Sequence, residues 1–373
     1  MSLEYSDVSK LAKSRERPMI YLVIFGVLIF LRYILVGQAT LRIQLLPILT
    51  FFLFIFSAFR FQVGCDWSNY LIQYSGYNPE AANSFNLFNE PLYKISLELL
   101  YFLDLTFPWI NVITSAIFFA GIYSLAIRQP DPLATLIFMF PILILNMPMS
   151  GIRQGAAIGF MCFAFMAFID KKLLKYILFV ILATGFHTSA IIFLALLPFL
   201  GGQFTYSRIF IAILLAIPGI FFLLVSSFAQ VAIDRYITGG YEAFGASFRI
   251  YSLAIGAMIF FISFRSRWQM KFNDEYTLIF LGSLMMISCL ALLLVSSTIS
   301  DRIGYYLIPL QAIFFARIPF FQVQWKIFWT MFPYILVATL FIGWISLSSL
   351  FEACYLPYYN FLLGIPRSEI SLF

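Results

Sequence analysis

Arg153 and His187 are the residues of this sequence best suited to chemistry on a phosphate-linked substrate. Arg153 follows Ser150 and Gly151 and opens an apolar run. An arginine there is costly unless an anion meets it, and its planar fork suits a phosphate group. His187 is the one histidine and stands in the polar turn TGFHTS, where it is a candidate general base or phosphate ligand. The alternative is a hydrogen-bonded structural histidine.

A second group of candidates lies in the longest polar interval, from Arg60 to Pro91. Arg60 ends an apolar run, so it is either an interfacial anchor or a phosphate ligand. Asp66 follows the flexible Gly64, and Glu90 begins an amphipathic segment, where its carboxylate suits a helix N-terminus. Both are candidate bases. Nearby aromatic residues are candidates for holding sugars: Trp67, Tyr70 and Tyr74.

Three further polar residues occur at apolar helix ends. Gln154 follows Arg153, and Asp301 precedes Arg302 in SDRIGYY. The Asp301 and Arg302 side chains either form a local ion pair or join the site. We assign Arg302 to phosphate, and Gln154 and Asp301 to sugar or acceptor binding.

Several familiar chemistries are excluded by motif. The sequence has no GxxxxGK[ST] phosphate loop, no HExxH, no GxSxG and no DxD cluster. Its four cysteines form no CxxC pair and no metal spacing. We therefore predict a site without metal or cofactor, dominated by arginine and aromatic residues.

The composition defines the class of protein that positions these residues. Apolar residues make up 62% of the chain and charged residues 11%, with a mean hydropathy of +0.94. Soluble domains carry about 25% charged residues. The apolar runs have helix length and lack the alternating pattern of a barrel. The sequence predicts an all-α polytopic bundle, whose net charge of +6 reflects membrane topology and not nucleic-acid binding.

About twelve spans are predicted. They run near 19–36, 43–59, 107–127, 132–147, 152–169, 173–186, 189–200, 209–228, 248–264, 276–296, 303–316 and 327–347. The stretch 176–200 is either one span containing His187 or a hairpin of two short spans with His187 at its turn. Basic residues on both flanks favour the hairpin, because positive charge concentrates on the cytoplasmic side.

The loops then alternate between two sides. Ten basic residues fall on the side assigned to the cytoplasm: Arg128, Lys171, Lys172, Lys175, Arg208, Arg265, Arg267, Lys271, Arg317 and Lys326. Seven fall on the other: Arg60, Lys94, Arg153, Arg235, Arg249, Arg302 and Arg367. This assignment brings all the candidate site residues to the outer face.

The N-terminus conflicts with it. Its basic tail favours the cytoplasm, yet two spans before Arg60 would put that tail outside. Arg32 and Arg42 flank the first short connection, and their charges favour the orientation opposite to the one that the tail favours. Either the first run does not cross fully, or the tail is an interfacial helix.

We expect one membrane domain with short terminal extensions. Residues 1–18 form a polar basic tail, 19–348 the polytopic domain, and 349–373 an outer-face tail. Within the domain, 60–106 forms an outer loop with an interfacial helix, in which Leu92, Ile95, Leu99 and Phe102 recur at helical spacing.

The ordered segments FRFQVGCDWSNY, NEPLY, GIRQGAA, GFHTSA and YLPYYN resemble the EpsG/Wzy-type family of bacterial polysaccharide polymerases. The resemblance covers most of the chain from Arg60 onward. It implies a GT-C-like glycosyltransferase in the bacterial cytoplasmic membrane. The enzyme would act at the periplasmic or outer face and join repeat units carried on undecaprenyl diphosphate into O-antigen, capsule or exopolysaccharide. A chain-length regulator protein is a further expected partner.

For this reaction, we expect Arg153, with Arg60 or Arg302, to neutralise the diphosphate. His187, Asp66 or Glu90 would activate the acceptor hydroxyl, with His187 ranked first on its pKa. The alternatives are a flippase or exporter of the same lipid-linked sugars, a ligase that moves finished glycan to another lipid, and a membrane acyltransferase that uses His187.

Overall fold

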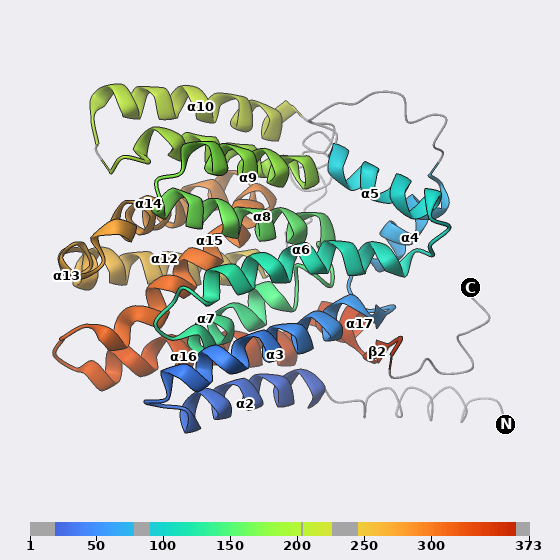
Figure 1. The fold of residues 1–373 in the computed structure, drawn as a ribbon, viewed down its shortest axis with the longest axis horizontal. Helices are drawn as coiled ribbons and strands as arrows, with labels where there is room; N and C mark the ends of the chain where they lie inside the picture. Colours follow the sequence, from blue (N-terminus) through green and yellow to red (C-terminus); the bar gives the residue numbers. More distant parts are fainter. Residues whose placement is uncertain (1–18, 78–89, 203, 226–244, 363–373) are drawn as a thin grey trace.

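The computed structural model describes residues 19–77, 90–202, 204–225 and 245–362 as an antiparallel bundle of helices along one long axis (Figure 1). The helices that run along this axis are α2 (Met19–Ile34), α3 (Ala39–Ala58), α6 (Pro108–Ala126), α7 (Pro132–Met139) with η3 (Phe140–Ile144), α8 (Ile152–Ile169), α9 (Leu173–Phe186), η4 (Thr188–Phe199), α10 (Tyr206–Val225), α12 (Ala246–Ile259) with η6 (Phe260–Phe264), α14 (Asn273–Val295), α15 (Ser297–Arg317) with η7 (Ile318–Phe320), and α16 (Lys326–Leu347). Each predicted span coincides with one of them. The all-helical prediction is confirmed.

Seven helices in the described part of the chain are long and apolar enough to cross a membrane: Ala39–Ala58, Pro108–Ala126, Ile152–Ile169, Ala246–Lys271, Asn273–Val295, Ser297–Phe320 and Lys326–Leu347. Five shorter apolar helices accompany them: Met19–Ile34, Pro132–Ile144, Leu173–Phe186, Thr188–Phe199 and Tyr206–Ile217. The chain is therefore a polytopic helical membrane protein. Twelve crossings and a GT-C-like architecture stay predictions.

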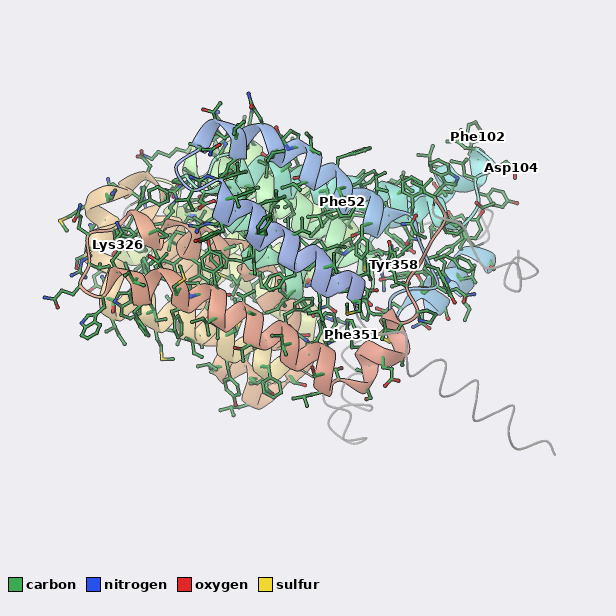
Figure 2. The ribbon with its side chains drawn as sticks, turned by 90° about the horizontal axis from the view of Figure 1, so that it is seen from below. Phe52, Phe102, Asp104, Lys326, Phe351 and Tyr358 are labelled. Atoms are coloured by element: carbon green, nitrogen blue, oxygen red, sulfur yellow. A yellow bond between two sulfur atoms is a disulfide. The ribbon has the colours of Figure 1, made fainter. Side chains whose placement is uncertain are left out.

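The two ends of the bundle differ in their connections. One end, at the left of Figure 1, carries α13 (Arg265–Lys271) and the turns with the predicted cytoplasmic arginines and lysines. We call it the basic end. The opposite end carries the short elements α4 (Trp67–Ser75), α5 (Pro91–Phe102), α17 (Ser349–Tyr355), β1 (Arg60–Phe61) and β2 (Tyr359–Asn360). We call it the site end. Figure 2 shows Lys326 at the first end and Phe102 with Asp104 at the second.

Helix α2 runs from the site end to the basic end. The Tyr21 hydroxyl near its start donates to the Tyr355 carbonyl at 2.8 Å. Near its other end, Arg32 pairs with Asp131 at 3.1 Å, and Arg42 of α3 pairs with the same carboxylate at 2.7 Å. The first apolar run thus extends along the bundle and places Arg32 and Arg42 at the basic end. The predicted tail 1–18 and Arg235 and Arg367 lie outside the described residues.

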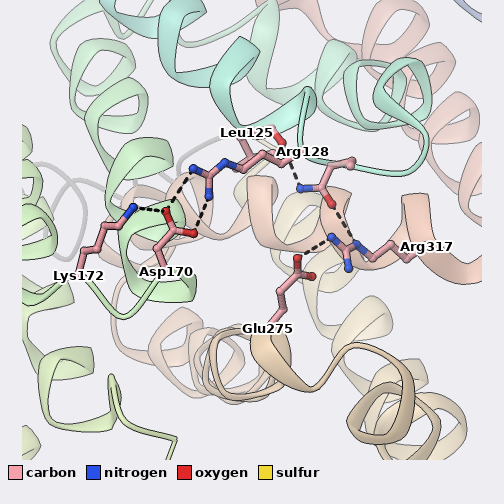
Figure 3. Close-up of polar contacts among 7 residues, drawn as sticks. Leu125, Arg128, Asp170, Lys172, Glu275 and Arg317 are labelled. Carbon is pink, nitrogen blue, oxygen red and sulfur yellow. Dashed lines mark hydrogen bonds and ion pairs between the residues drawn. The ribbon is translucent and has the colours of Figure 1, made fainter. Parts of the chain in front are cut away.

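Ion pairs join neighbouring turns at the basic end (Figure 3). Arg128 binds both carboxylate oxygens of Asp170, at 2.9 and 3.2 Å. Arg317 donates to the Gln129 side chain at 3.0 Å and to Glu275 at 2.6 Å. These contacts tie the connection between α6 and α7 to α8, α14 and α15. Asp170 also pairs with Lys172 at 3.3 Å.

Two long-range links close the site end. Strand β1 pairs antiparallel with β2, with Arg60 opposite Asn360. Cys65 and Cys354 form a disulfide between residues 289 positions apart. Neither their spacing nor a motif relates the two cysteines, so this bond was not predicted. Together these links fix the Arg60 loop to the segment after α16.

Glycines permit the close helix approach beneath the site end. A Cβ on Gly121 of α6 would lie 2.1 Å from the Gly159 carbonyl oxygen of α8, and one on Gly159 would lie 2.4 Å from that of Ile117. Gly64 has φ +107°, and a Cβ there would lie 1.9 Å from the Met149 carbonyl oxygen. The glycines of GIRQGAAIG therefore seat α8 against α6 and fix the start of α8, where Arg153 lies.

Helix α5 exposes most of its predicted apolar face, since Ile95 and Leu99 are each 46% exposed and Phe102 is 85% exposed. Its place in the membrane interface stays a prediction. Tyr93, Leu97 and Leu100 form the buried face. Because Leu92 packs beside Gly185 of α9, the start of α5 lies next to the α9–η4 turn.

Candidate functional site

Glu90 is the centre of the polar contacts at the site end. One of its carboxylate oxygens, Oε1, lies 2.6 Å from His187 Nδ1, and the other, Oε2, accepts from Arg153 Nη1 at 2.5 Å. Glu90 is the N-cap residue of α5, as expected from its carboxylate, but its side chain makes no cap hydrogen bond to the helix. Its backbone has φ 53° and ψ 57°, a left-handed conformation that is unfavourable for glutamate. Contacts on both carboxylate oxygens hold the side chain in this position.

Arg153 lies in the first turn of α8, between two tyrosine rings. Its guanidinium carbon is 5.7 Å from the Tyr70 ring centroid and 5.5 Å from that of Tyr93. Such faces attract a cation and leave N–H donors at its edge. The Tyr93 hydroxyl is buried and has no hydrogen-bond partner among the described residues. Tyr93 was not among the predicted site residues, although the NEPLY segment contains it.

His187 occupies the turn between α9 and η4, which form the predicted hairpin. The Tyr176 hydroxyl of α9 donates to the Phe193 carbonyl of η4 at 2.5 Å and holds the two halves together. The histidine backbone is extended, with φ −152° and ψ 116°, and interrupts the helical path. This turn directs the imidazole to Glu90.

The protonation states of this pair follow from burial and neighbouring charge. Burial raises the pKa of Glu90, but hydrogen bonds and charges from His187 and Arg153 outweigh it, so the pKa lies well below its usual 4.5. Burial also lowers the pKa of His187 below 6.5; the Glu90 contact opposes this, while Arg302 and Arg153 add to it. At neutral pH, Glu90 is therefore an anion and His187 is neutral. Its Nδ1–H donates to Glu90, which leaves Nε2 as the basic nitrogen.

Asp66 and Arg302 belong to the same electrostatic cluster. Burial raises the pKa of Asp66 above its usual 3.8, against a hydrogen bond from Asn69 and the charges of Arg153 and Arg302. The Arg302 carbonyl accepts from Gln154 Nε2 at 2.6 Å, which ties α15 to α8. The two carboxyl groups of the site thus have pKa values displaced in opposite directions, a pattern typical of acid and base pairs.

Asp301 makes its ion pair with Arg249 and not locally with Arg302. Both carboxylate oxygens accept from Arg249 of α12 at 2.7 Å. The Arg249 guanidinium also lies 5.1 Å from the Tyr305 ring centroid. This role of Arg249 was not predicted, since 52 residues separate the partners. The pair fixes the start of α15, directly before Arg302.

A sequence profile of the EpsG family matches residues 43–360, which is most of the chain and contains all these side chains. The chain belongs to the EpsG family. EpsG proteins are Wzy-type polysaccharide polymerases. Searches of curated proteins and of solved structures found no significant match.

Arg60 has a different place in this EpsG chain from the expected one. Its side chain is fully buried and donates to the carbonyls of Ser57 and Val63 and to Asn111 Oδ1, at 2.8, 2.9 and 3.0 Å. Its guanidinium carbon lies 5.7 Å from the Trp67 ring centroid. A phosphate has no access to such a group. We therefore assign Arg60 to holding the loop between α3 and α4.

Two of the three predicted sugar-binding aromatics have structural contacts. Trp67 is 5% exposed and packs edge-on against Phe107. The Tyr74 hydroxyl donates to the Leu105 carbonyl at 2.6 Å. Tyr70 alone of the three lies against Arg153. Sugar binding by Trp67 and Tyr74 thus has no geometric support.

The disulfide supports Asp66 and Arg153 together. The Cys65 backbone N–H donates to Ser150 Oγ at 2.8 Å, and Ser150 Oγ lies 3.2 Å from the Tyr355 hydroxyl. That hydroxyl donates to Asn146 at 3.0 Å. This network joins the segment before Asp66 to the turn that precedes Arg153. The two halves of the site are therefore positioned by one set of contacts.

The arrangement can neutralise an anion and accept a proton close to it. Arg153 and Arg302 supply the positive charge, and His187, held by Glu90, supplies the base. Within the described ranges, no group of three or more His, Cys, Asp or Glu side chains is placed to hold a metal ion. A metal-free reaction stays a prediction.

Proposed function

We propose that this EpsG-family protein polymerises oligosaccharide repeat units carried on undecaprenyl diphosphate. The observation that carries the proposal is the convergence of Arg153 and His187 on the two carboxylate oxygens of Glu90. A diphosphate-linked donor needs an anion site, and a hydroxyl acceptor needs a base beside it. Both are a few ångströms apart here.

In the proposed step, the acceptor sugar hydroxyl attacks the anomeric carbon of the donor glycan. A new C–O bond forms while the bond from that carbon to the diphosphate oxygen breaks. The hydroxyl proton passes to His187 Nε2, and the bonding electrons leave with the diphosphate. Arg153 and Arg302 neutralise the charge that develops on this leaving group.

Glu90 has a positioning role in this mechanism. It fixes the His187 tautomer through Nδ1–H and stabilises the imidazolium that forms. Arg153 uses Nη1 for Glu90 and also forms a side-chain hydrogen bond with Tyr70. Its remaining N–H groups can donate to phosphate oxygens. Asp66 is the second candidate base, because burial raises its pKa. Asp301 and Arg249 hold Arg302 in place.

We place the site end outside the cytoplasmic membrane of a bacterium. Two observations support this orientation. Disulfides persist in oxidising compartments, and Cys65–Cys354 lies at the site end. Arg32 and Arg42 add to the basic residues of the other end, and positive charge favours the cytoplasmic side. A chain-length regulator protein is a further proposed partner.

The direct test is polymer formation by purified protein with a lipid-linked repeat unit. Arg153→Ala is compared with Arg128→Ala, because each arginine pairs with one carboxylate, at opposite ends of the bundle. We expect Arg153→Ala to lower the rate about 10²- to 10³-fold, as for loss of a group that stabilises the leaving charge. Arg128→Ala should keep it.

Gel filtration and thermal melting confirm that both variants are folded, and a parallel reaction contains EDTA. Full activity in folded Arg153→Ala would overturn the proposal, and loss of activity in EDTA would overturn the metal-free mechanism. A product one unit long would instead indicate a ligase.

A further inference from the structure

A polar cavity of about 650 Å³ lies at the basic end, away from the proposed site. It is enclosed by the ends of α8 and η4, by α13 and by the first turns of α14. In Figure 1 these segments meet at the left of the bundle. The polymerase mechanism uses none of them, so the cavity needs a separate explanation.

Positive charge exceeds negative charge in this cavity. Lys171 and Arg265 line it, and Asp274 is its carboxylate. Within the described residues, none of these three forms an ion pair with a protein group. By contrast, Lys172, next to Lys171, pairs with Asp170 at 3.3 Å. The cavity thus presents two cations and one carboxylate to a ligand.

The Arg265 side chain is positioned by uncharged neighbours, so its positive charge is not neutralised by them. Its Nε donates to the Tyr276 hydroxyl at 3.1 Å, and its guanidinium carbon lies 5.0 Å from the Phe280 ring centroid. Both partners are uncharged, so the cationic charge remains available to an anion. The remaining guanidinium N–H groups can donate to phosphate oxygens.

Gly201 and Gly202 line another side of the cavity and add no side chain to it. A Cβ on Gly202 would lie 3.5 Å from Thr277 Oγ1, and Gly202 has φ +74°, which disfavours other residues. A Cβ on Gly201 would lie 3.3 Å from Arg208 Nη1. A side chain at either glycine would therefore meet a neighbouring group, and the Thr277 hydroxyl is a further hydrogen-bonding group in the cavity wall.

The chain leads directly from this cavity onto an apolar surface. Phe204 lines the cavity and is 43% exposed, and α10 begins two residues later. On α10, Ile209, Phe210 and Ile213 are 43%, 62% and 57% exposed. A ligand with a phosphate head in the cavity could lay hydrocarbon chains along this helix. A free phosphate would make no use of it.

We propose that this cavity binds the phosphate headgroup of an anionic phospholipid from the leaflet at the basic end. Lys171 and Arg265 pair with the phosphate, and basic residues between transmembrane helices are typical of such sites. The acyl chains lie against α10. The proposal is independent of the polymerase assignment, because it shares no residue with the site end.

The test measures binding of dioctanoyl phosphatidylglycerol to the full-length protein in detergent by native mass spectrometry. The double variant Lys171→Ala/Arg265→Ala is compared with Lys326→Ala, which removes a basic residue of the same end outside the cavity. We expect about 30-fold weaker binding in the double variant, since each cation is worth about fivefold. Lys326→Ala should bind normally.

Two further ligands distinguish the source of the phosphate. Dioctanoyl phosphatidylcholine should bind at least about tenfold more weakly than phosphatidylglycerol, because it carries no net negative charge. Inorganic phosphate at millimolar concentration should not displace the lipid. Equal binding of the two lipids, displacement by phosphate, or unchanged binding in a folded double variant would each overturn the proposal. Arg153→Ala should still bind the lipid, which separates this result from failure of the proposed polymerase function.

Discussion

The two ends of this bundle use the same residue types in different arrangements. At the basic end, Arg128 pairs with Asp170 and Arg317 with Glu275, and each pair joins adjacent turns. At the site end, an arginine and a histidine from separate helices share the single carboxylate of Glu90. The residue before α5 adopts an unfavourable backbone conformation to make this possible. Two arginines also share one buried carboxylate at the basic end, where Arg32 and Arg42 pair with Asp131. Glu90 differs in having a histidine as one of its two partners and a left-handed backbone, and these features mark the candidate site.

The largest effect should come from the proposed base. We expect His187→Asn to lower the polymerisation rate about 10²- to 10⁴-fold, because it removes the group that accepts the acceptor proton. Ser189→Ala is the control, since Ser189 lies in the same turn region and contacts Tyr306 and not Glu90. Substantial activity in folded His187→Asn would transfer the role of base to Asp66 and weaken the contrast between the ends.

The pH dependence of the rate separates these two candidate bases. Neutral His187 is the active form, and its pKa lies below 6.5. The rate should therefore be constant above pH 6.5 and fall about tenfold per pH unit once the pH passes below the histidine pKa.

Asp66→Asn tests this assignment, because it removes the carboxyl group with the raised pKa but leaves His187 in place. In Asp66→Asn, the fall of the rate at acidic pH should occur at the same pH as in the wild type. If this variant showed no fall of the rate at acidic pH, Asp66 would be identified as the base.

A smaller effect is expected from the helix contact beneath the site. In Gly159→Ala, the new Cβ would meet the backbone carbonyl of Ile117, so α8 must move away from α6. We expect a loss of about 1–3 kcal/mol of stability, measured as a lower Tm in detergent. Gly343→Ala is the matched control in α16, where a Cβ meets nothing within 4 Å. Equal melting temperatures would show that this contact does not hold the start of α8 in place.

Hydropathy predicted the helices well because it is a local property. Each predicted apolar interval coincides with one helix, and the hairpin at His187 is present as expected. The family resemblance is confirmed by the match over residues 43–360. Composition and ordered short motifs are sufficient for conclusions of this kind.

The partners of the charged residues could not be predicted in the same way. Nothing in the sequence indicated that Glu90 pairs with both Arg153 and His187. Arg60 was considered as an interfacial anchor or a phosphate ligand, although its side chain is buried among carbonyls. Arg249 and the Cys65–Cys354 bond were missed, since their partners are 52 and 289 residues away. These contacts depend on the packing of whole helices, and spacing along the chain carries no information about them.

The most direct test compares Glu90→Gln with Glu275→Gln in polymer formation from a lipid-linked repeat unit. Each glutamate accepts from one arginine, Arg153 or Arg317, at opposite ends of the bundle. We predict that Glu90→Gln lowers the rate at least about 100-fold while the protein stays folded, because His187 loses its orienting anion. Glu275→Gln should retain the wild-type rate. Equal rates in the two variants would contradict the conclusion that convergence on Glu90 builds the active site.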